Sequence, residues 1–356
     1  MGVDAQCGPL VSAWPDPRFE ALLGSLLPIV AAPMAGAAGV ELAVAAMLGG
    51  AVGSLPCAML TPEQARAQAA EVRARAAGPL NLNFFCHREP APVDEEAWRA
   101  LLRPLYAEAG VAEPSAAPPS RKPFDAAMCE IVEEVRPDLV SFHFGLPEPV
   151  LLDRVRAAGA RVLGNATTIE EAAWLADRGV DAIIAQGWEA GGHAGRFLGA
   201  APEEQMGLFA LLPQIADATG LPVIAAGGIG DARGIAAALT LGATAVQLGT
   251  AYLHCPECTI TPAHRDALSG GGAAHTRFTN LYSGGLARSL PSPLIERVGA
   301  IRPEAPPFPL AANALVPLGL RPMWAGQAAA LGRPEPARAL TERLGREALA
   351  LLGGRG

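Results

Sequence analysis

The amino-acid sequence predicts an α/β protein, a (β/α)8 or TIM barrel with a cap subdomain inserted after its eighth strand. Eight short apolar runs alternate with helical segments, a pattern that indicates a parallel sheet covered by helices. Hydrophobic residues make up 51% of the 356 residues and charged residues 17%, which is ample material for a large core. No GxGxxG motif joins an early strand to its helix, which disfavours the competing fold, a doubly wound open sheet.

The expected strands are short, apolar and bounded by glycine or proline. The run from Pro28 to Pro33 is closed by proline and is typical of a strand buried on both faces. Glycines 145, 187, 227 and 249 mark the ends of later strands. We expect strands at residues 28–33, 51–55, 80–85, 138–144, 161–165, 182–185, 222–226 and 243–248.

Start and stop signals place helices between these strands. Thr61, Pro62 and Glu63 provide a cap, a proline at the first helical position and an acid in the first turn. Thr168 and Glu171 have the spacing of a capping box. We expect helices at residues 40–48, 61–77, 95–109, 124–135, 149–158, 168–178, 208–218 and 231–241, and a final helical region at 323–352.

This pattern divides the chain into a barrel and a cap. Residues 1–250 form the barrel, residues 319–356 complete it, and residues 251–318 form the cap, or substrate subdomain. The Pro/Ala/Ser-rich segment 111–123 is expected to be mobile, and its role is left open.

Charge and cysteine content exclude several functions. The net charge of −8 has no basic run, so nucleic acid is not expected as a partner. The apolar stretches 21–40 and 42–60 are interrupted by Pro28 and Pro33 and lack flanking basic clusters, which predicts a buried strand and helix rather than membrane spans. Six irregularly spaced cysteines indicate a reducing, cytoplasmic location, and the role of Cys255 and Cys258 is left open.

The candidate site lies where barrels bind ligands, at the carboxyl ends of the strands. His193 stands there in a loop with Gly187, Gly191, Gly192 and Gly195, and Gly227-Gly228 follows the next strand. Two such turns on adjacent strands can hold a phosphate with backbone N–H groups. The predicted rim has no paired carboxylates for glycoside hydrolysis and no metal-ligand spacing. An organic redox cofactor with one phosphate and a flat ring is therefore favoured, and FMN meets that description.

The chain resembles the nitronate monooxygenase (2-nitropropane dioxygenase) family. The matching pieces occur in family order: Ala31-Ala-Pro-Met-Ala35, Leu82-Asn-Phe84, Ser141-Phe-His-Phe-Gly145, Glu189-Ala-Gly-Gly-His-Ala-Gly195, Ala225-Ala-Gly-Gly-Ile229, Gln247-Leu-Gly-Thr250 and Ser283-Gly-Gly-Leu-Ala-Arg288. This resemblance implies FMN-dependent oxidation of alkyl nitronates, with nitroalkanes as further candidates, by O2 to a carbonyl compound and nitrite. It also implies a cofactor site made of Ala32, Pro33, Met34, Asn83, Gln186, Gly191, Gly192, Gly227, Gly228, Gln247, Gly249 and Thr250.

The same resemblance implies roles for side chains near the substrate. His193 would be the catalytic base or the partner of the anionic substrate, while His143, Tyr282 and Arg288 would lie on the substrate side or support it. The sequence departs from the family at Ala194 and Gly285, where many members have larger side chains, which leaves pocket size open. The other histidines, His87, His254, His264 and His275, are expected on the surface or in the cap.

Other functions stay open from the sequence alone. One is an NAD(P)H-dependent flavin reductase of quinones or enoyl thioesters on the same barrel. Others are a flavin-binding structural barrel and a phosphate-binding barrel without redox chemistry. The physiological substrate, reduction by NAD(P)H and the oligomeric state, with a homodimer as one option, are undetermined.

Overall fold

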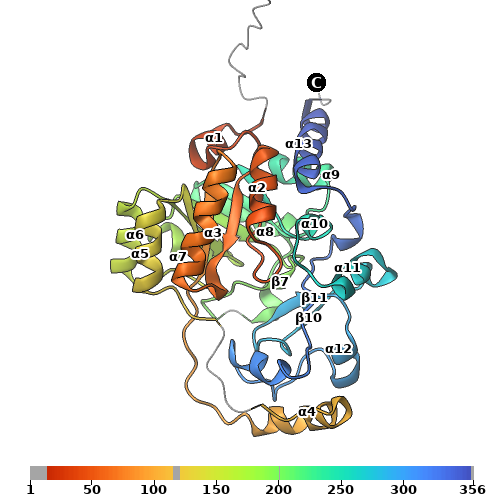
Figure 1. Ribbon diagram of the computed structural model, residues 1–356. Coiled ribbons are helices and arrows are strands. Elements are labelled where there is room, and N and C mark those ends of the chain that lie inside the picture. The colour runs from red at the N-terminus through yellow and green to blue at the C-terminus, as the bar shows by residue number, and fades with distance from the viewer. Residues whose placement is uncertain (1–13, 115–120, 200, 354–356) are drawn as a thin grey trace, which may run out of the picture.

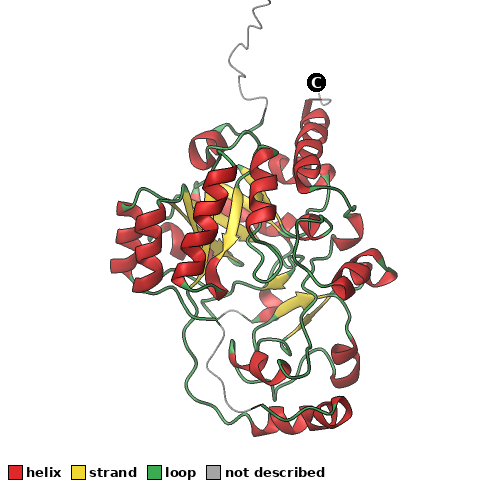
Figure 2. Cartoon of the chain, in the orientation of Figure 1, coloured by secondary structure: helices red, strands yellow, loops and turns green. Residues whose placement is uncertain are grey.

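A computed structural model describes residues 14–114, 121–199 and 201–353. Its larger part is a parallel sheet inside a layer of helices (Figures 1 and 2). The strands follow one another in the order β1-β9-β8-β6-β5-β4-β3-β2. Their bounds are β1 Ile29–Ala31, β2 Gly53–Pro56, β3 Leu80–Phe85, β4 Leu139–His143, β5 Arg161–Ala166, β6 Ala182–Gln186, β8 Val223–Ala226 and β9 Ala245–Leu248.

The two end strands of this order also touch, so the sheet closes into a barrel. Val30 of β1 forms a parallel bridge with Val52, directly before β2. The Ala31 N–H donates to the Val52 carbonyl at 3.0 Å, and the Val52 N–H donates to the Ile29 carbonyl at 2.9 Å. The predicted (β/α)8 barrel is therefore confirmed.

Eight helices follow the eight strands and cover the outside of the barrel. They are α2 Val40–Leu48, α3 Pro62–Arg75, α5 Ala126–Val135, α6 Pro149–Ala157, α7 Ile169–Ala176, α8 Leu208–Thr219, α9 Ala232–Thr240 and α13 Ala337–Gly353. The last of these, α13, packs against both α9 and α2 and so closes the ring of helices. The described apolar stretch before residue 60 becomes β1, α2 and β2, as expected, and their side chains are mostly buried. Within the described residues, no helix is long and apolar enough to cross a membrane.

A short helix before the barrel, α1 Arg18–Leu23, closes the amino-terminal end of the barrel interior. Its Phe19 and Leu23 pack with Val30, Leu139 and Ile224, which point inward from the strands. Phe19 is completely buried, and burial of a side chain this large stabilises the fold by about 1.5–3 kcal/mol. The opposite end of the barrel is left for the cap and the site.

The cap contains a small antiparallel sheet and three short helices. The sheet has the order β10 Arg277–Thr279, β11 Ala287–Ser289 and β7 Gly192–His193. The helices are α10 Thr250–Leu253, α11 Pro262–Ser269 and α12 Pro293–Val298. The sequence predicts a loop at residues 192–193, which was wrong, because β11 supplies a strand partner from a part of the chain that lies far away in sequence.

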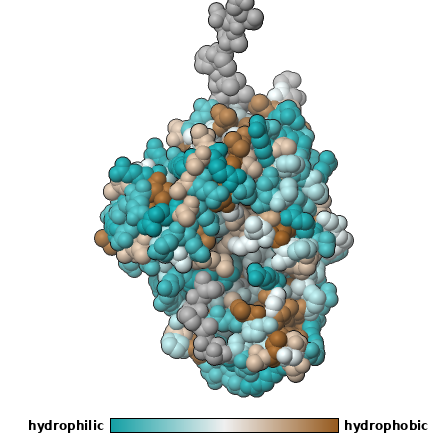
Figure 3. All heavy atoms as spheres, viewed as in Figure 1, coloured by the Kyte–Doolittle hydropathy of each residue, from teal (hydrophilic) through white to brown (hydrophobic). Residues whose placement is uncertain are grey.

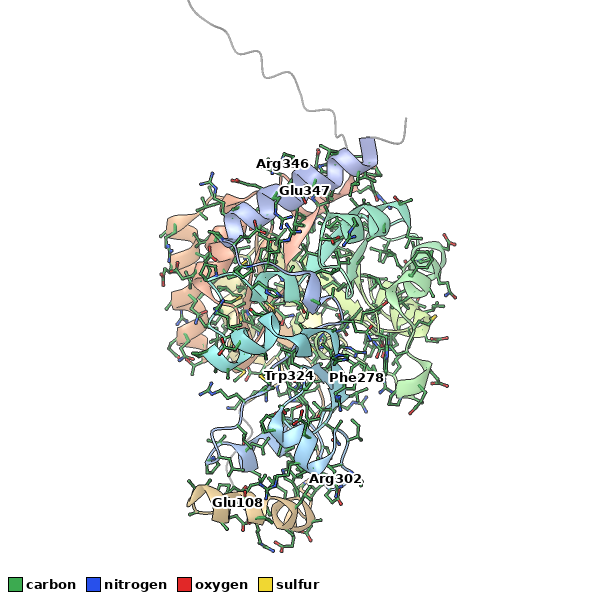
Figure 4. All side chains as sticks on the ribbon, turned by 90° about the vertical axis from the view of Figure 1, so that its right-hand side faces the viewer. Glu108, Phe278, Arg302, Trp324, Arg346 and Glu347 are labelled. Carbon is green, nitrogen blue, oxygen red and sulfur yellow. The ribbon has the colours of Figure 1, made fainter. Side chains whose placement is uncertain are left out.

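Helix α4, Glu96–Ala109, belongs to the cap by its packing, although the sequence division placed it within residues 1–250. Its Trp98, Leu102 and Tyr106 are buried against cap residues that include Leu294 and Leu315. The Glu108 carboxylate pairs with Arg297 of α12. Figures 1 and 4 show α4 at the end of the cap that is remote from the barrel.

Two further expectations were wrong in detail. The final helix begins at Ala337, not Met323, because prolines and glycines in residues 322–336 prevent a helix and the chain crosses the site instead. The reciprocal capping box forms between Thr61 and Gln64. At Thr168 only the threonine half of the box forms, since the Glu171 carboxylate turns to Thr167 and to the N–H groups of Phe197 and Leu198.

Hydrophilic side chains cover most of the face seen in Figure 3, and the hydrophobic ones form small separate groups. The segment 111–123, which was expected to be mobile, lies partly outside the described residues, and one of the six cysteines, Cys7, lies wholly outside them.

Candidate active site

A cavity of about 310 Å³ lies between the carboxyl ends of the barrel strands and the cap. It brings together most of the predicted site. The predicted residues that line it are Ala32, Pro33, Met34, Asn83, His143, Gln186, Gly191, Gly192, His193, Gly227, Gly228, Gln247, Gly249 and Thr250. None of the described lining residues is an aspartate or a glutamate. An anionic ligand would therefore meet no carboxylate there.

The turn after β8 has the backbone that a phosphate cradle needs. Gly227 and Gly228 have φ angles of +106° and +70°, a region that side chains with a Cβ rarely adopt. Their N–H groups have no hydrogen-bond partner among the described residues. A Cβ on Gly228 would lie 3.2 Å from the Glu189 Cβ, so only glycine keeps this turn open. Nearby, the Gln247 side-chain oxygen is buried without a partner.

The loop that carries His193 is held by amide side chains within the barrel. The Gln186 amide donates to the His193 carbonyl at 2.9 Å, and its oxygen accepts from the Gly195 N–H at 2.8 Å. The Asn165 amide donates to the same Gln186 oxygen at 3.2 Å. Gln186, which was predicted to contact a cofactor, therefore lines the cavity but uses its polar atoms to position this loop. The Asn83 amide nitrogen is bonded to Ser141, which leaves its oxygen as an acceptor.

Gly191 and Gly326 allow the loop that carries His193 to pack closely against the crossing segment 322–336. A Cβ on Gly191 would lie 2.5 Å from the Gly326 nitrogen. The Gly326 N–H donates to the Thr250 hydroxyl at 2.9 Å, and the Gln327 N–H donates to the Glu189 carbonyl at 2.9 Å. This packing fastens the crossing segment 322–336 to the loop that carries His193.

His193 lies among aromatic rings and one hydroxyl group. Its ring is 5.1 Å from that of Phe308 and 5.4 Å from that of Trp324, measured between centroids. Its Nε2 is 2.8 Å from the Ser283 hydroxyl, which also accepts from the Gly285 N–H at 3.3 Å. Nδ1 has no hydrogen-bond partner among the described residues, so it is left for a ligand. Sequence reasoning quoted Ser283 in a motif but gave it no role.

Burial makes His193 a neutral imidazole. Desolvation, then the positive charge of Arg121, and repulsion from His143 and His87 when these are protonated, hold the pKa of His193 well below its ordinary value of 6.5. At neutral pH the free side chain can therefore accept a proton.

Two other histidines lie near His193. His143 lines the cavity, and burial lowers its pKa to about 4. His87, expected on the surface or in the cap, is buried beneath the cap, with its ring 4.9 Å from Phe308. Burial followed by the charge of Arg121 lowers the pKa of His87 to about 4. The alternating strand before it gave no sign that the cap would cover this position.

Arg121 is a lining residue that sequence reasoning missed. Its side chain is buried, and its Cζ lies 5.9 Å from the centre of the Phe308 ring. Phe308 is far along the chain, so no local pattern could reveal this contact.

Tyr282 and Arg288, predicted near the substrate, lie outside the cavity lining. The Tyr282 hydroxyl bonds the Ser292 hydroxyl at 2.7 Å inside the cap. The Arg288 Nη2 donates to the Trp188 carbonyl at 2.8 Å, and its Cζ lies 4.2 Å from the centre of the Phe278 ring. Figure 4 places Phe278 and Trp324 at the junction of cap and barrel. Both predicted residues therefore support the cap around the site.

The remaining histidines lie in the cap segment 251–318, as expected. His254 and His264 are buried there and His264 lines the cavity, whereas His275 is exposed. Burial raises the pKa of the Cys258 thiol to about 12 and also raises that of Cys255, which makes both poor nucleophiles. Within the described part of the chain, no three His, Cys, Asp or Glu side chains gather as a metal site.

Comparison with known proteins agrees with this geometry. A sequence profile described as nitronate monooxygenase matches residues 17–340. The chain is 43% identical to a nitronate monooxygenase of Paraburkholderia phytofirmans over 342 residues, covering 92% of this chain and 93% of the relative. It is 42% identical to one of Pseudomonas aeruginosa over 344 residues, covering 92% and 97%.

Solved structures also resemble this chain over most of its length. A nitroalkane oxidase from Streptomyces ansochromogenes matches with a TM-score of 0.86 and 32% identity, over 95% of this chain and 99% of that one. FabK from Thermotoga maritima matches with a TM-score of 0.72 and 24% identity, over 95% and 97%, which shows a shared fold.

Proposed function

The chain belongs to the nitronate monooxygenase family of flavin-dependent oxidoreductases, and from that premise we propose that it oxidises alkyl nitronates with FMN and O2 to a carbonyl compound and nitrite. One observation carries the proposal. A neutral, half-buried His193 faces a cavity that has no described carboxylate and that also contains the glycine turn at 227–228.

The cavity residues match the chemistry of FMN. The free N–H groups of Gly227 and Gly228 would bind its phosphate, together with the turn at Gly249 and Thr250. The unpaired Gln247 oxygen would accept a hydrogen bond from a polar edge of the cofactor. Ala32, Pro33 and Met34 would form an apolar wall beside the flat ring. Bound FMN would supply the electron acceptor for the nitronate and the site where O2 reacts.

His193 would act through the nitrogen that the protein leaves unbonded. In the tautomer in which Nε2 donates to the Ser283 hydroxyl, Nδ1 carries no proton and is the base. With a neutral nitroalkane, Nδ1 would take the proton from the carbon next to the nitro group, and the resulting imidazolium would pair with the nitronate. With a nitronate already formed, His193 would orient the anion. The hydrogen bonds of Gln186 fix the backbone that carries the ring, for either substrate.

Anaerobic mixing of the flavin-loaded enzyme tests this function. A nitronate should bleach the flavin absorbance rapidly, and admission of O2 should restore it with release of nitrite. Bleaching by NADH but not by the nitronate would overturn the proposal in favour of a reductase. A purified protein without flavin absorbance after incubation with FMN would contradict the cofactor assignment.

A further inference from the structure

Arg121 is a buried cation without a described counter-ion. Its side chain is 9% exposed, and its Nε and Nη1 have no hydrogen-bond partner among the described residues. Burial lowers the pKa of the guanidinium, and no carboxylate among the described residues opposes that shift. An arginine stays charged even so, and an uncompensated buried charge is strongly destabilising. Such a residue costs the fold stability unless a ligand supplies the missing negative charge.

The guanidinium lies on the same side of the cavity as His193. Phe308 contacts both side chains, with its ring centre 5.9 Å from the Arg121 Cζ and 5.1 Å from the centre of the His193 ring. Phe85 and His143 line the same region. An anion placed next to His193 would therefore have Arg121 as its nearby positive charge.

The phosphate of a bound cofactor is not the partner of this cation. Arg121 follows β3 along the chain, and the Phe124 N–H three residues later donates to the Phe85 carbonyl at 2.7 Å, which keeps this segment at the end of β3. In the closed order of eight strands, β3 lies opposite β8. The glycine turn at 227–228 follows β8 and is thus across the barrel from Arg121.

We propose that Arg121 binds the two oxygens of the substrate's nitronate group and makes the enzyme bind the anion more tightly than the neutral nitroalkane. A guanidinium presents parallel N–H donors that match two oxygens on one atom, as it does with a carboxylate. Neutral His193 supplies no charge to the free site. Two arginines line the cavity, and Arg121 is buried whereas Arg321 is exposed, so Arg121 is the desolvated cation. This assignment rests on the proposed function for the identity of the anion.

Nitrate, a planar oxyanion, is the probe that separates anion binding from turnover. We would titrate the flavin-loaded enzyme with sodium nitrate by calorimetry, in the wild type and in Arg121→Met, Arg121→Lys and Lys122→Met. Lys122 is the matched control, because it is the adjacent cation and its side chain is exposed. Loss of a buried charge partner should weaken nitrate binding at least about 30-fold in Arg121→Met, and less in Arg121→Lys. Lys122→Met should stay within about 2-fold of the wild type.

Kinetics then test selection of the nitronate. In Arg121→Met, KM for an alkyl nitronate should rise at least about 30-fold, while KM for the corresponding nitroalkane should change less than about 3-fold. The melting temperature of Arg121→Met should equal or exceed that of the wild type, since an unpaired buried charge has been removed.

Several outcomes would overturn the assignment. One is that the wild type does not bind nitrate, and another is that Arg121→Met binds nitrate within about 3-fold of the wild type. A third is a large fall in melting temperature in both Arg121 variants, because that result would make the residue structural. A wild type that does not oxidise nitronates would overturn the proposed function. The nitrate titration would still decide whether Arg121 is an anion-binding residue.

Discussion

Replacing Gly195 by alanine tests whether protein contacts hold the loop that carries His193. A Cβ at this position would lie 2.2 Å from the Asn165 Nδ2 and 2.6 Å from the His143 Cε1. Asn165 is tied to Gln186, and the His143 ring packs 4.5 Å from that of Phe144, so neither neighbour can move freely. Because Gly195 has no positive φ, the effect is a steric clash and not backbone strain. The loop itself must therefore move.

The size of the effect follows from these contacts. Overpacking a buried position costs about 1–3 kcal/mol. Loss of the 2.8 Å bond from the Gly195 N–H to Gln186 adds about 1 kcal/mol. We expect the free energy of unfolding to fall by about 2–4 kcal/mol. A displacement of about 1 Å at His193 should lower kcat/KM for a nitronate on the order of 100-fold.

The assay combines urea unfolding, flavin content and oxygen uptake with a nitronate. Gly271→Ala is the matched control, because Gly271 has no positive φ and an added Cβ there would have no atom within 4 Å. Both the stability and the kcat/KM of this control should match those of the wild type. Wild-type kcat/KM in Gly195→Ala, at equal flavin content, would refute the idea that this packing positions His193.

Two other predictions concern the cofactor and pH. Gly228 has a φ of +70°, and an added Cβ there would lie 3.2 Å from the Glu189 Cβ, so Gly228→Ala should weaken FMN binding about 10-fold. The fluorescence of released flavin measures this binding. Gly199→Ala is the control, because Gly199 has the same left-handed backbone but lies outside the cradle, and this variant should keep FMN. Burial lowers the pKa of His264 to about 4 from 6.5, so below pH 6.5 the unfolded chain binds a proton that the folded chain does not. As the pH falls from 6.5 to about 4, His264 therefore lowers the free energy of unfolding by about 1.4 kcal/mol per pH unit. Urea unfolding should show a slope that is smaller by this amount in His264→Gln, whereas His275→Gln, at an exposed position, should keep the wild-type slope.

The barrel was predictable because its signals are local. Each strand is a short apolar run that ends at glycine or proline, and the carboxyl ends of all eight strands must meet at one face. Residues at strand ends, such as Asn83, His143 and Gln247, were therefore placed together correctly from the sequence.

The cap was less predictable because it is assembled from distant segments. Helix α4 has an amphipathic pattern, but the sequence does not show that its apolar face packs on residues 281–315. The same applies to Arg121 and His87, which are buried by Phe308. Arg288 ends a motif near the site and Tyr282 directly precedes that motif, yet their side chains bond within the cap and at its junction with the barrel. A motif locates a segment, and packing decides which of its side chains reach the cavity.

The central claim is that neutral His193 acts on a nitronate beside a bound flavin. The most direct measurement is kcat/KM for an alkyl nitronate in the wild type and in His193→Asn, followed by oxygen uptake and nitrite release at equal flavin content. We predict a loss of at least about 100-fold in His193→Asn, because the nitronate loses the group that orients it, with flavin binding retained. A variant that turns over the nitronate at the wild-type rate would contradict this account.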